Sequence, residues 1–60
     1  MTRYQAGGGP FSGQILALDV SAGQQVRLEA ADGSVHIYEA QGSEIAGGGA
    51  YNLFYVGLAL

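Results

Sequence analysis

The sequence predicts an all-β protein, on the strength of three observations. Glycine supplies 11 of the 60 residues and recurs along most of the chain. Between the glycines lie short runs rich in Val, Ile, Leu and Tyr, which is the pattern of strands separated by turns. No window forms a convincing amphipathic helix, because glycine interrupts the alanine-containing segments at about 1 kcal/mol relative to alanine. We therefore expect a four- or five-stranded antiparallel meander, curled into a small barrel or half-sandwich.

Residues 1–13 are expected to form a glycine-rich arm, and residues 14–60 a single small β domain. The arm contains the triplet Gly7-Gly8-Gly9, and the same triplet returns at Gly47-Gly48-Gly49. Each triplet is followed two positions later by an aromatic residue, Phe11 or Tyr51. Because glycine has no Cβ, it lets a chain pass close to a neighbouring backbone. Both triplets are interpreted as flexible approaches to a hydrophobic strand.

Four strands are predicted, over residues 14–20, 25–31, 34–40 and 51–60. The second has the cleanest alternation, with Gln25, Arg27 and Glu29 on one face and Val26, Leu28 and Ala30 on the other. Asp32-Gly33 follows it and is typical of a two-residue type I′ hairpin turn. That turn would place Leu28 opposite Ile37, and Glu29 opposite His36.

The expected core consists of apolar residues from all four strands: Ile15, Leu16, Leu18, Val26, Leu28, Val35, Ile37, Leu53, Phe54, Val56 and Leu58. The first and last strands are apolar on both faces, and such strands need cover on both faces. In the last strand, one face is expected to close the core, with Phe54, Val56, Leu58 and Leu60. The other face, with Leu53 and Tyr55, is expected to meet a neighbour.

Size and composition favour assembly with other chains. A 60-residue chain buries only about 60% of its unfolded surface, and disulfides, metals or oligomerisation usually reinforce such domains. The sequence has no cysteine and one histidine, so we expect no disulfide, no metal and no cofactor. It is 48% hydrophobic and 12% charged, against about 25% charged in an average globular domain. We expect a homo-oligomer, or a place in a larger assembly such as a capsid, with these interface residues: Tyr4, Phe11, Tyr51, Leu53, Phe54, Tyr55 and Leu60.

The charge pattern disfavours nucleic acid and membranes as partners. Net charge is −3, and Arg3 and Arg27 are the only basic side chains. A single subunit therefore has no electrostatic footprint for nucleic acid or anionic lipid. The apolar run at residues 50–60 is shorter than the roughly 20 residues of a membrane-spanning helix.

No catalytic residues are expected. Neither glycine triplet is followed by lysine or opens a helix, as a phosphate-binding loop would require. His36 could act as a base for a nearby serine, but the expected register makes it a cross-strand partner of Glu29. Nothing in the sequence supplies the oxyanion donors and concave pocket that hydrolysis also needs. We predict that the protein is not an enzyme.

The segment GQILALDVSAGQQVRLEAADG, residues 13–33, resembles the first half of the Sm-type small barrel. In that pattern a glycine begins a strand and an aspartate follows six residues later, as Gly13 and Asp19 do. The sequence departs from the family at Val56, which stands where an arginine would precede Gly57, and it lacks the N-terminal helix. The resemblance implies a ring-forming small barrel.

The sequence favours a structural, non-enzymatic assembly protein that forms a symmetric oligomer or joins a larger lattice. One setting is a virion auxiliary role, as a decoration, cement or spike component; outside that setting the expected location is the cytoplasm. The alternative is an Sm-like or SH3-like small-barrel module that binds nucleic acid or peptide.

Overall fold

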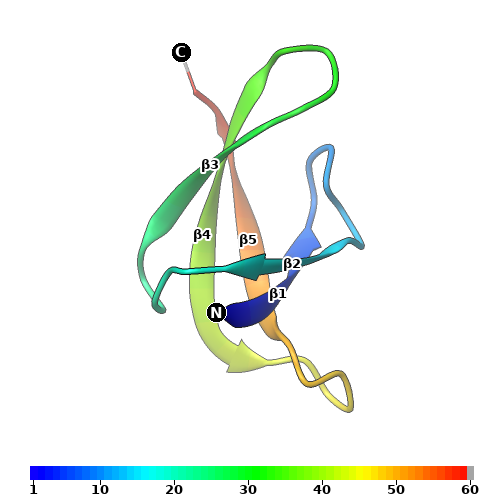
Figure 1. The fold of residues 1–60 in the computed structure, drawn as a ribbon, viewed down its shortest axis with the longest axis vertical. Helices are drawn as coiled ribbons and strands as arrows, with labels where there is room; N and C mark the ends of the chain where they lie inside the picture. Colours follow the sequence, from blue (N-terminus) through cyan, green and yellow to red (C-terminus); the bar gives the residue numbers. More distant parts are fainter. Residues whose placement is uncertain (60) are drawn as a thin grey trace.

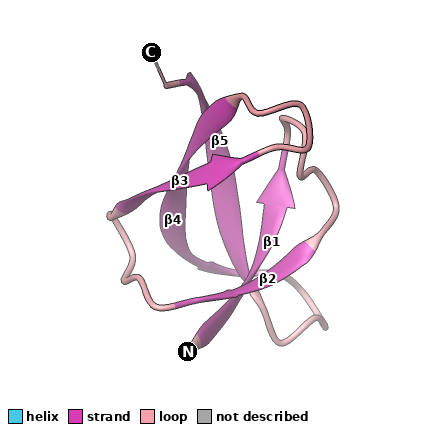
Figure 2. Ribbon diagram, turned by 45° about the horizontal axis from the view of Figure 1, so that its top comes forward, coloured by secondary structure: helices cyan, strands magenta, loops and turns pink. Residues whose placement is uncertain are grey.

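The computed structural model describes residues 1–59 and contains five strands in one sheet. The strands are β1 (Thr2–Gly7), β2 (Ile15–Leu18), β3 (Gln25–Glu29), β4 (Val35–Glu44) and β5 (Tyr51–Leu58), in the order β2-β1-β5-β4-β3. The sheet curls into a half-barrel measuring 32 × 19 × 17 Å, with β2 and β3 as its two edges (Figures 1 and 2). The predicted all-β class is confirmed. Residues 1–59 contain no helix that could cross a membrane.

The sheet is mixed, so the expected antiparallel meander is wrong. β1 runs parallel to β5, with Tyr4 opposite Tyr51, whereas the other three strand pairs are antiparallel. The parallel pair arises because the first strand lies beside the last one, between β2 and β5. The structure thus places β1, which lies within the expected arm of residues 1–13, inside the sheet.

The hairpin between β3 and β4 differs by one residue from the expected register. Ala30 N–H donates to the Ser34 carbonyl at 2.8 Å, and Gly33 N–H donates to the Ala30 carbonyl at 3.0 Å. Gly33 has φ +87°, while no residue other than glycine has positive φ in the described chain. Asp32 therefore cannot supply the first position of a type I′ turn, and the loop is a three-residue type I turn with a glycine bulge. Leu28 faces His36 and Glu29 faces Val35, which corrects both expected pairs.

An irregularity in β5 fixes which of its faces points inward. Tyr38 pairs with Tyr55 but Ile37 pairs with Gly57, so Val56 is an extra residue in a β-bulge. Leu53 is buried and Tyr55 is half-buried, whereas Phe54 and Val56 are exposed. From Leu53 to Val56 the two faces of β5 are therefore the reverse of the expected ones. Leu53 and Tyr55 face the interior, and Phe54 and Val56 face outward. Leu60 lies outside the described residues.

The core is small and built largely from tyrosine and alanine. Its buried residues are Tyr4, Ala6, Tyr38, Ala40 and Leu53, and partly buried side chains pack against them: Phe11, Leu16, Leu18, Val20, Val26, Leu28 and Tyr55. Small barrels commonly alternate small and large interior residues to fit their taper. Of the eleven expected core residues only Leu53 is fully buried, while Ile15, Phe54, Val56 and Leu58 are exposed. On β3, β4 and β5 the one-residue register change and the bulge account for the difference, because a slip of one residue moves side chains to the opposite face.

The loop that joins β1 to β2 closes over two of the tyrosines. Tyr38 O–H donates to the Gly8 carbonyl at 2.8 Å, and Phe11 N–H donates to the Tyr38 hydroxyl oxygen at 3.2 Å. At Gly9 an added Cβ would collide with the Tyr38 hydroxyl and lie 2.6 Å from Cδ1 of Tyr55. The first glycine triplet is thus part of the packing against the core.

Candidate functional site

The side chains best suited to contact a partner are the exposed apolar ones. Large apolar residues stay 37–91% exposed at six positions: Met1, Ile15, Tyr51, Phe54, Val56 and Leu58. Among residues 1–59, by contrast, the core buries only two large side chains completely, Tyr38 and Leu53. Exposed apolar side chains indicate an interaction site where they form one contiguous patch.

Two of these side chains share one face of the sheet. On β5, Leu53 points inward, so Phe54 and Val56 point outward by the alternation of a strand. Phe54 is 62% exposed and Val56 is 49% exposed. Half-buried Ile37 of β4 lies beside the bulge at Val56. We call the surface formed by Ile37, Phe54 and Val56 the β4–β5 outer face.

The neighbours of Phe54 leave its ring open. Glu39 of β4 pairs with it on one side, and Gly7 of β1 pairs with it on the other. Gly7 has no side chain that could cover the ring. Beside the ring lies a hollow of about 290 Å³, lined by Gly7, Gln41, Ser43, Asn52, Leu53 and Phe54. A protruding aromatic ring therefore adjoins a concave surface.

The expected interface residues divide into inward and outward groups. Tyr4 and Leu53 are buried at 3% and 1% exposure, so their side chains face the interior. Phe11 and Tyr55 are half-buried and pack against Tyr38, with ring centroids 6.1 and 5.1 Å away. Tyr51 and Phe54 are exposed.

Four polar side chains form a continuous hydrogen-bonded chain at the end of the barrel near the β3–β4 turn. Ser34 Oγ–H donates to Asp32 Oδ1 at 2.6 Å, and Ser34 N–H donates to the same oxygen at 3.0 Å. Ser34 Oγ lies 2.8 Å from His36 Nε2, and Tyr55 O–H lies 2.9 Å from His36 Nδ1. We call this set the Asp32–Tyr55 chain.

The geometry of this chain determines its proton arrangement. The pKa of Asp32 lies below its ordinary value of 3.8, mainly because of the hydrogen bond from the Ser34 side chain and then that from the Ser34 backbone. An ionised carboxylate only accepts hydrogen bonds, so the single hydroxyl proton of Ser34 is donated to Asp32. With its proton directed at Asp32, the Ser34 hydroxyl oxygen can accept from His36 Nε2, and His36 Nδ1 lies within hydrogen-bond distance of the Tyr55 hydroxyl. These contacts tie the Ser34 hydroxyl and backbone N–H to the Asp32 carboxylate and so hold the turn.

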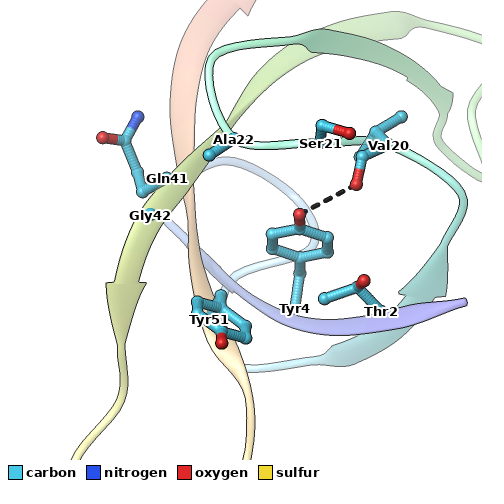
Figure 3. A pocket seen from close by; sticks show the side chains of 8 residues that line it. All are labelled: Thr2, Tyr4, Val20, Ser21, Ala22, Gln41, Gly42 and Tyr51. Atoms are coloured by element: carbon cyan, nitrogen blue, oxygen red, sulfur yellow. Dashed lines mark hydrogen bonds between the residues drawn. The ribbon is translucent and has the colours of Figure 1, made fainter.

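Two further hollows lie on the described surface. One, of about 540 Å³, adjoins the Asp32–Tyr55 chain and is lined by Pro10, Ala30, Ala31, Asp32, Ser34, His36 and Leu58. The other, of about 240 Å³, lies between the β2–β3 loop and the ends of β1 and β5 (Figure 3). At its floor Tyr4 O–H donates to the Val20 carbonyl at 3.0 Å, and the Gln41 side chain points away from that hydroxyl (Figure 3).

Ionisable residues are dispersed. Among residues 1–59, no three His, Asp or Glu side chains are grouped so that they could hold a metal ion. Arg3 and Arg27 lie on β1 and β3, which two other strands separate in the sheet.

The sequence reasoning missed the Asp32–Tyr55 chain. A signal was present, because Asp32, Ser34 and His36 follow one another at a spacing of two, which places alternate strand residues on one face. The expected register instead paired His36 with Glu29, whereas His36 lies opposite Leu28.

Comparison of the chain with family models, with curated proteins and with solved structures finds no match.

Proposed function

We propose that this protein is a structural, non-enzymatic assembly module that forms a symmetric homo-oligomer through its β4–β5 outer face. The observation that carries the proposal is the exposure of Phe54 and Val56 on β5, next to the hollow beside Phe54. Aromatic side chains in well-packed central pockets are the usual energetic anchors of interfaces.

A second copy is the partner that this surface fits best. In a two-fold symmetric interface the same patch is used by both subunits, so the patch must complement itself. Here the Phe54 ring and the adjoining hollow can exchange across a two-fold axis, each ring entering the other subunit's hollow. Ile37 and Val56 add apolar area, while Glu39 opposite Phe54 and Arg27 opposite Ile37 border the face with one charge of each sign.

The arrangement of Ser34 and His36 supports the non-enzymatic part of the proposal. Ser34 O–H donates to Asp32 at 2.6 Å, so its proton is directed away from His36 Nε2, which lies 2.8 Å from Ser34 Oγ. A serine hydrolase needs the opposite polarity, with the histidine accepting the serine proton.

The proposed setting is the surface of a larger particle, where the module would serve as a decoration, cement or spike component of a virion. Low charge and surplus apolar surface support a place in such a lattice. The alternative is a small-barrel module that binds nucleic acid or peptide. With two arginines per chain, it would form a basic surface only if an oligomer repeated them around a ring. Binding that weakens steeply with salt and is reduced in Arg27→Ala would favour it.

The test is sedimentation equilibrium of the intact chain and two matched variants. We expect wild-type protein to be oligomeric, and Phe54→Gln to shift it strongly toward smaller species. The control is Leu58→Gln, which replaces an apolar residue that is 59% exposed. Leu58 lies opposite His36, near the Asp32–Tyr55 chain and away from the β4–β5 outer face. The control variant should leave the oligomer intact. Equal effects of the two variants would show that the β4–β5 outer face is not the interface.

A further inference from the structure

The second candidate surface for assembly is the free edge of β2. β2 is hydrogen-bonded to β1 and has no strand on its other side in the sheet order. Its sequence is Ile-Leu-Ala-Leu, without charge, proline or glycine. Ile15 is 48% exposed, and Ala17 is exposed as well. An uncharged edge of this kind is a ready template for pairing with another strand.

The backbone groups that face the free edge can be assigned. Ala6 N–H donates to the Gln14 carbonyl at 2.9 Å. Residue pairs in an antiparallel ladder alternate between bonded and non-bonded. Leu16 and Leu18, opposite Tyr4 and Thr2, therefore direct their backbone groups toward β1. Ile15 and Ala17 direct theirs away from β1, toward the free edge.

The other edge of the sheet carries different side chains. Ala30 N–H donates to the Ser34 carbonyl, and Ala40 N–H donates to the Gln24 carbonyl. By the same alternation, the free backbone groups of β3 belong to Gln25, Arg27 and Glu29. These residues are exposed, polar and mostly charged, and charged side chains on an edge strand oppose edge-to-edge pairing. Of the two edges, β2 alone combines free backbone groups with uncharged side chains.

We infer that β2 pairs antiparallel with β2 of a second copy, which joins two half-barrels into one continuous sheet. The inference rests on the proposed assembly function and gives it a second contact, separate from the β4–β5 outer face. Two contacts on different surfaces let an assembly grow beyond a dimer, as a lattice requires.

The positions of the free groups specify the register. Ile15 of one copy pairs with Ala17 of the other, and Ala17 pairs with Ile15, which uses every edge-directed backbone group within the strand. The two-fold axis then passes between the two Leu16 residues, which form a non-hydrogen-bonded pair with Cα atoms about 4.5 Å apart. The two Leu18 residues would be separated along the strand by four residues, roughly 13 Å.

Single-cysteine cross-linking tests this register, because the native chain has no cysteine. A Cα separation of about 4.5 Å falls within the range of disulfides, whereas 13 Å does not. Under mild oxidation we expect Leu16→Cys to become a covalent dimer and Leu18→Cys to remain uncross-linked. Both side chains are half-buried on the same strand, so the two variants are matched in burial. Equal cross-linking of both, or none at Leu16→Cys, would overturn the inference.

Removal of one edge donor provides a second test. Ala17→Pro deletes an N–H that faces the free edge, a position at which proline is tolerated in strands. Arg27→Pro deletes the equivalent N–H on β3 and serves as the control. The far-ultraviolet circular dichroism spectrum and melting temperature of each variant report whether it folds. If Ala17→Pro does not fold, Ile15→Lys takes its place, with Gln25→Lys on β3 as the control. Lysine on an edge strand blocks pairing without altering the backbone.

The expected result is loss of β2-mediated association in Ala17→Pro or Ile15→Lys, with association retained in the β3 controls. If the β2 variants keep the full wild-type assembly size while Phe54→Gln reduces it, the edge contact is wrong and the proposed function stands. If wild-type protein is monomeric under all conditions, both fail.

Discussion

At the scale of single residues, tyrosine hydroxyls and glycines fasten the β1–β2 loop to the core. Tyr38 is fully buried, yet its hydroxyl reaches two backbone groups of that loop, at Gly8 and Phe11. Gly9 passes so close to Tyr38 and Tyr55 that no side chain fits there. Residues that form no catalytic arrangement can therefore still be intolerant of substitution.

Tyr38→Phe should lower the free energy of unfolding by about 1–3 kcal/mol, because the Gly8 carbonyl and Phe11 N–H both lose their partner. The control is Tyr51→Phe, a partly exposed tyrosine whose change should stay within about 0.5 kcal/mol. Urea unfolding at one fixed protein concentration measures both. Similar small losses in the two variants would show that the Tyr38 hydroxyl does not hold the loop.

Gly9→Ala and Gly47→Ala separate backbone strain from packing. Both glycines have positive φ, +67° and +72°, so each alanine incurs roughly 1–2 kcal/mol of strain. Only at Gly9 does the new Cβ collide with neighbours, while nothing lies within 4 Å at Gly47. We expect Gly9→Ala to lose about 1–3 kcal/mol more, the usual cost of overpacking. Equal losses in urea unfolding would mean that the loop adjusts freely over the tyrosines.

The Asp32 carboxyl should titrate below its ordinary pKa of 3.8 in the folded protein, because Ser34 donates two hydrogen bonds to it. A pKa depressed by folding means that the carboxylate stabilises the fold above about pH 3.8, and that this contribution is lost as pH falls through the folded value. Carbon-13 NMR titration of Asp32 measures the midpoint. Ser34→Ala should raise the midpoint toward 3.8; a midpoint that does not respond to this substitution would contradict the geometry.

At the scale of elements, the β3–β4 turn decides which side chains face inward. The Asp32-Gly33 dipeptide located the hairpin, and the alternation of residues 25–29 identified β3. The same dipeptide fits a two-residue or a three-residue loop, however, and the choice shifts the register by one. That shift moves Tyr38 into the core beside Val26.

Proline substitution at two adjacent alanines tests the turn. In the observed turn Ala30 N–H is bonded to Ser34, whereas Ala31 occupies the position of a type I turn that proline favours. Ala31→Pro should therefore leave stability unchanged or raise it by about 0.4–1 kcal/mol. Ala30→Pro should lower it by about 1 kcal/mol or more. A type I′ turn would reverse this order, so thermal unfolding of the two variants distinguishes the turns.

β1 is the strand that the sequence did not predict, and its residues show why. Its inward residues, Tyr4 and Ala6, alternate with polar Arg3 and Gln5, but alanine is a weak hydrophobic signal and a glycine triplet follows at once. Nothing local indicates that such a strand lies parallel to β5, since that pairing joins the two ends of the chain. Similarly, the length and apolar character of β5 were evident from sequence, but its inward face depends on register and on the bulge at Val56.

At the scale of the whole molecule, the distribution of apolar surface is the dominant feature. The half-barrel places Tyr and Ala inside and leaves Ile15, Phe54, Val56 and Leu58 exposed. The sequence indicated this surplus through its 48% hydrophobic content. Which residues make up the surplus could be learned only from the structure. Two of the exposed side chains lie on the β4–β5 outer face, and Ile15 lies on the free edge of β2.

Native mass spectrometry of the intact chain at micromolar concentration tests the central claim most directly. We expect a discrete homo-oligomer in wild-type protein, and a species no larger than a dimer in Phe54→Gln under the same conditions. Because 62% of the Phe54 side chain is exposed, its replacement should not unfold the subunit, which circular dichroism can verify. A wild-type protein that is folded and monomeric throughout the micromolar range would contradict the claim.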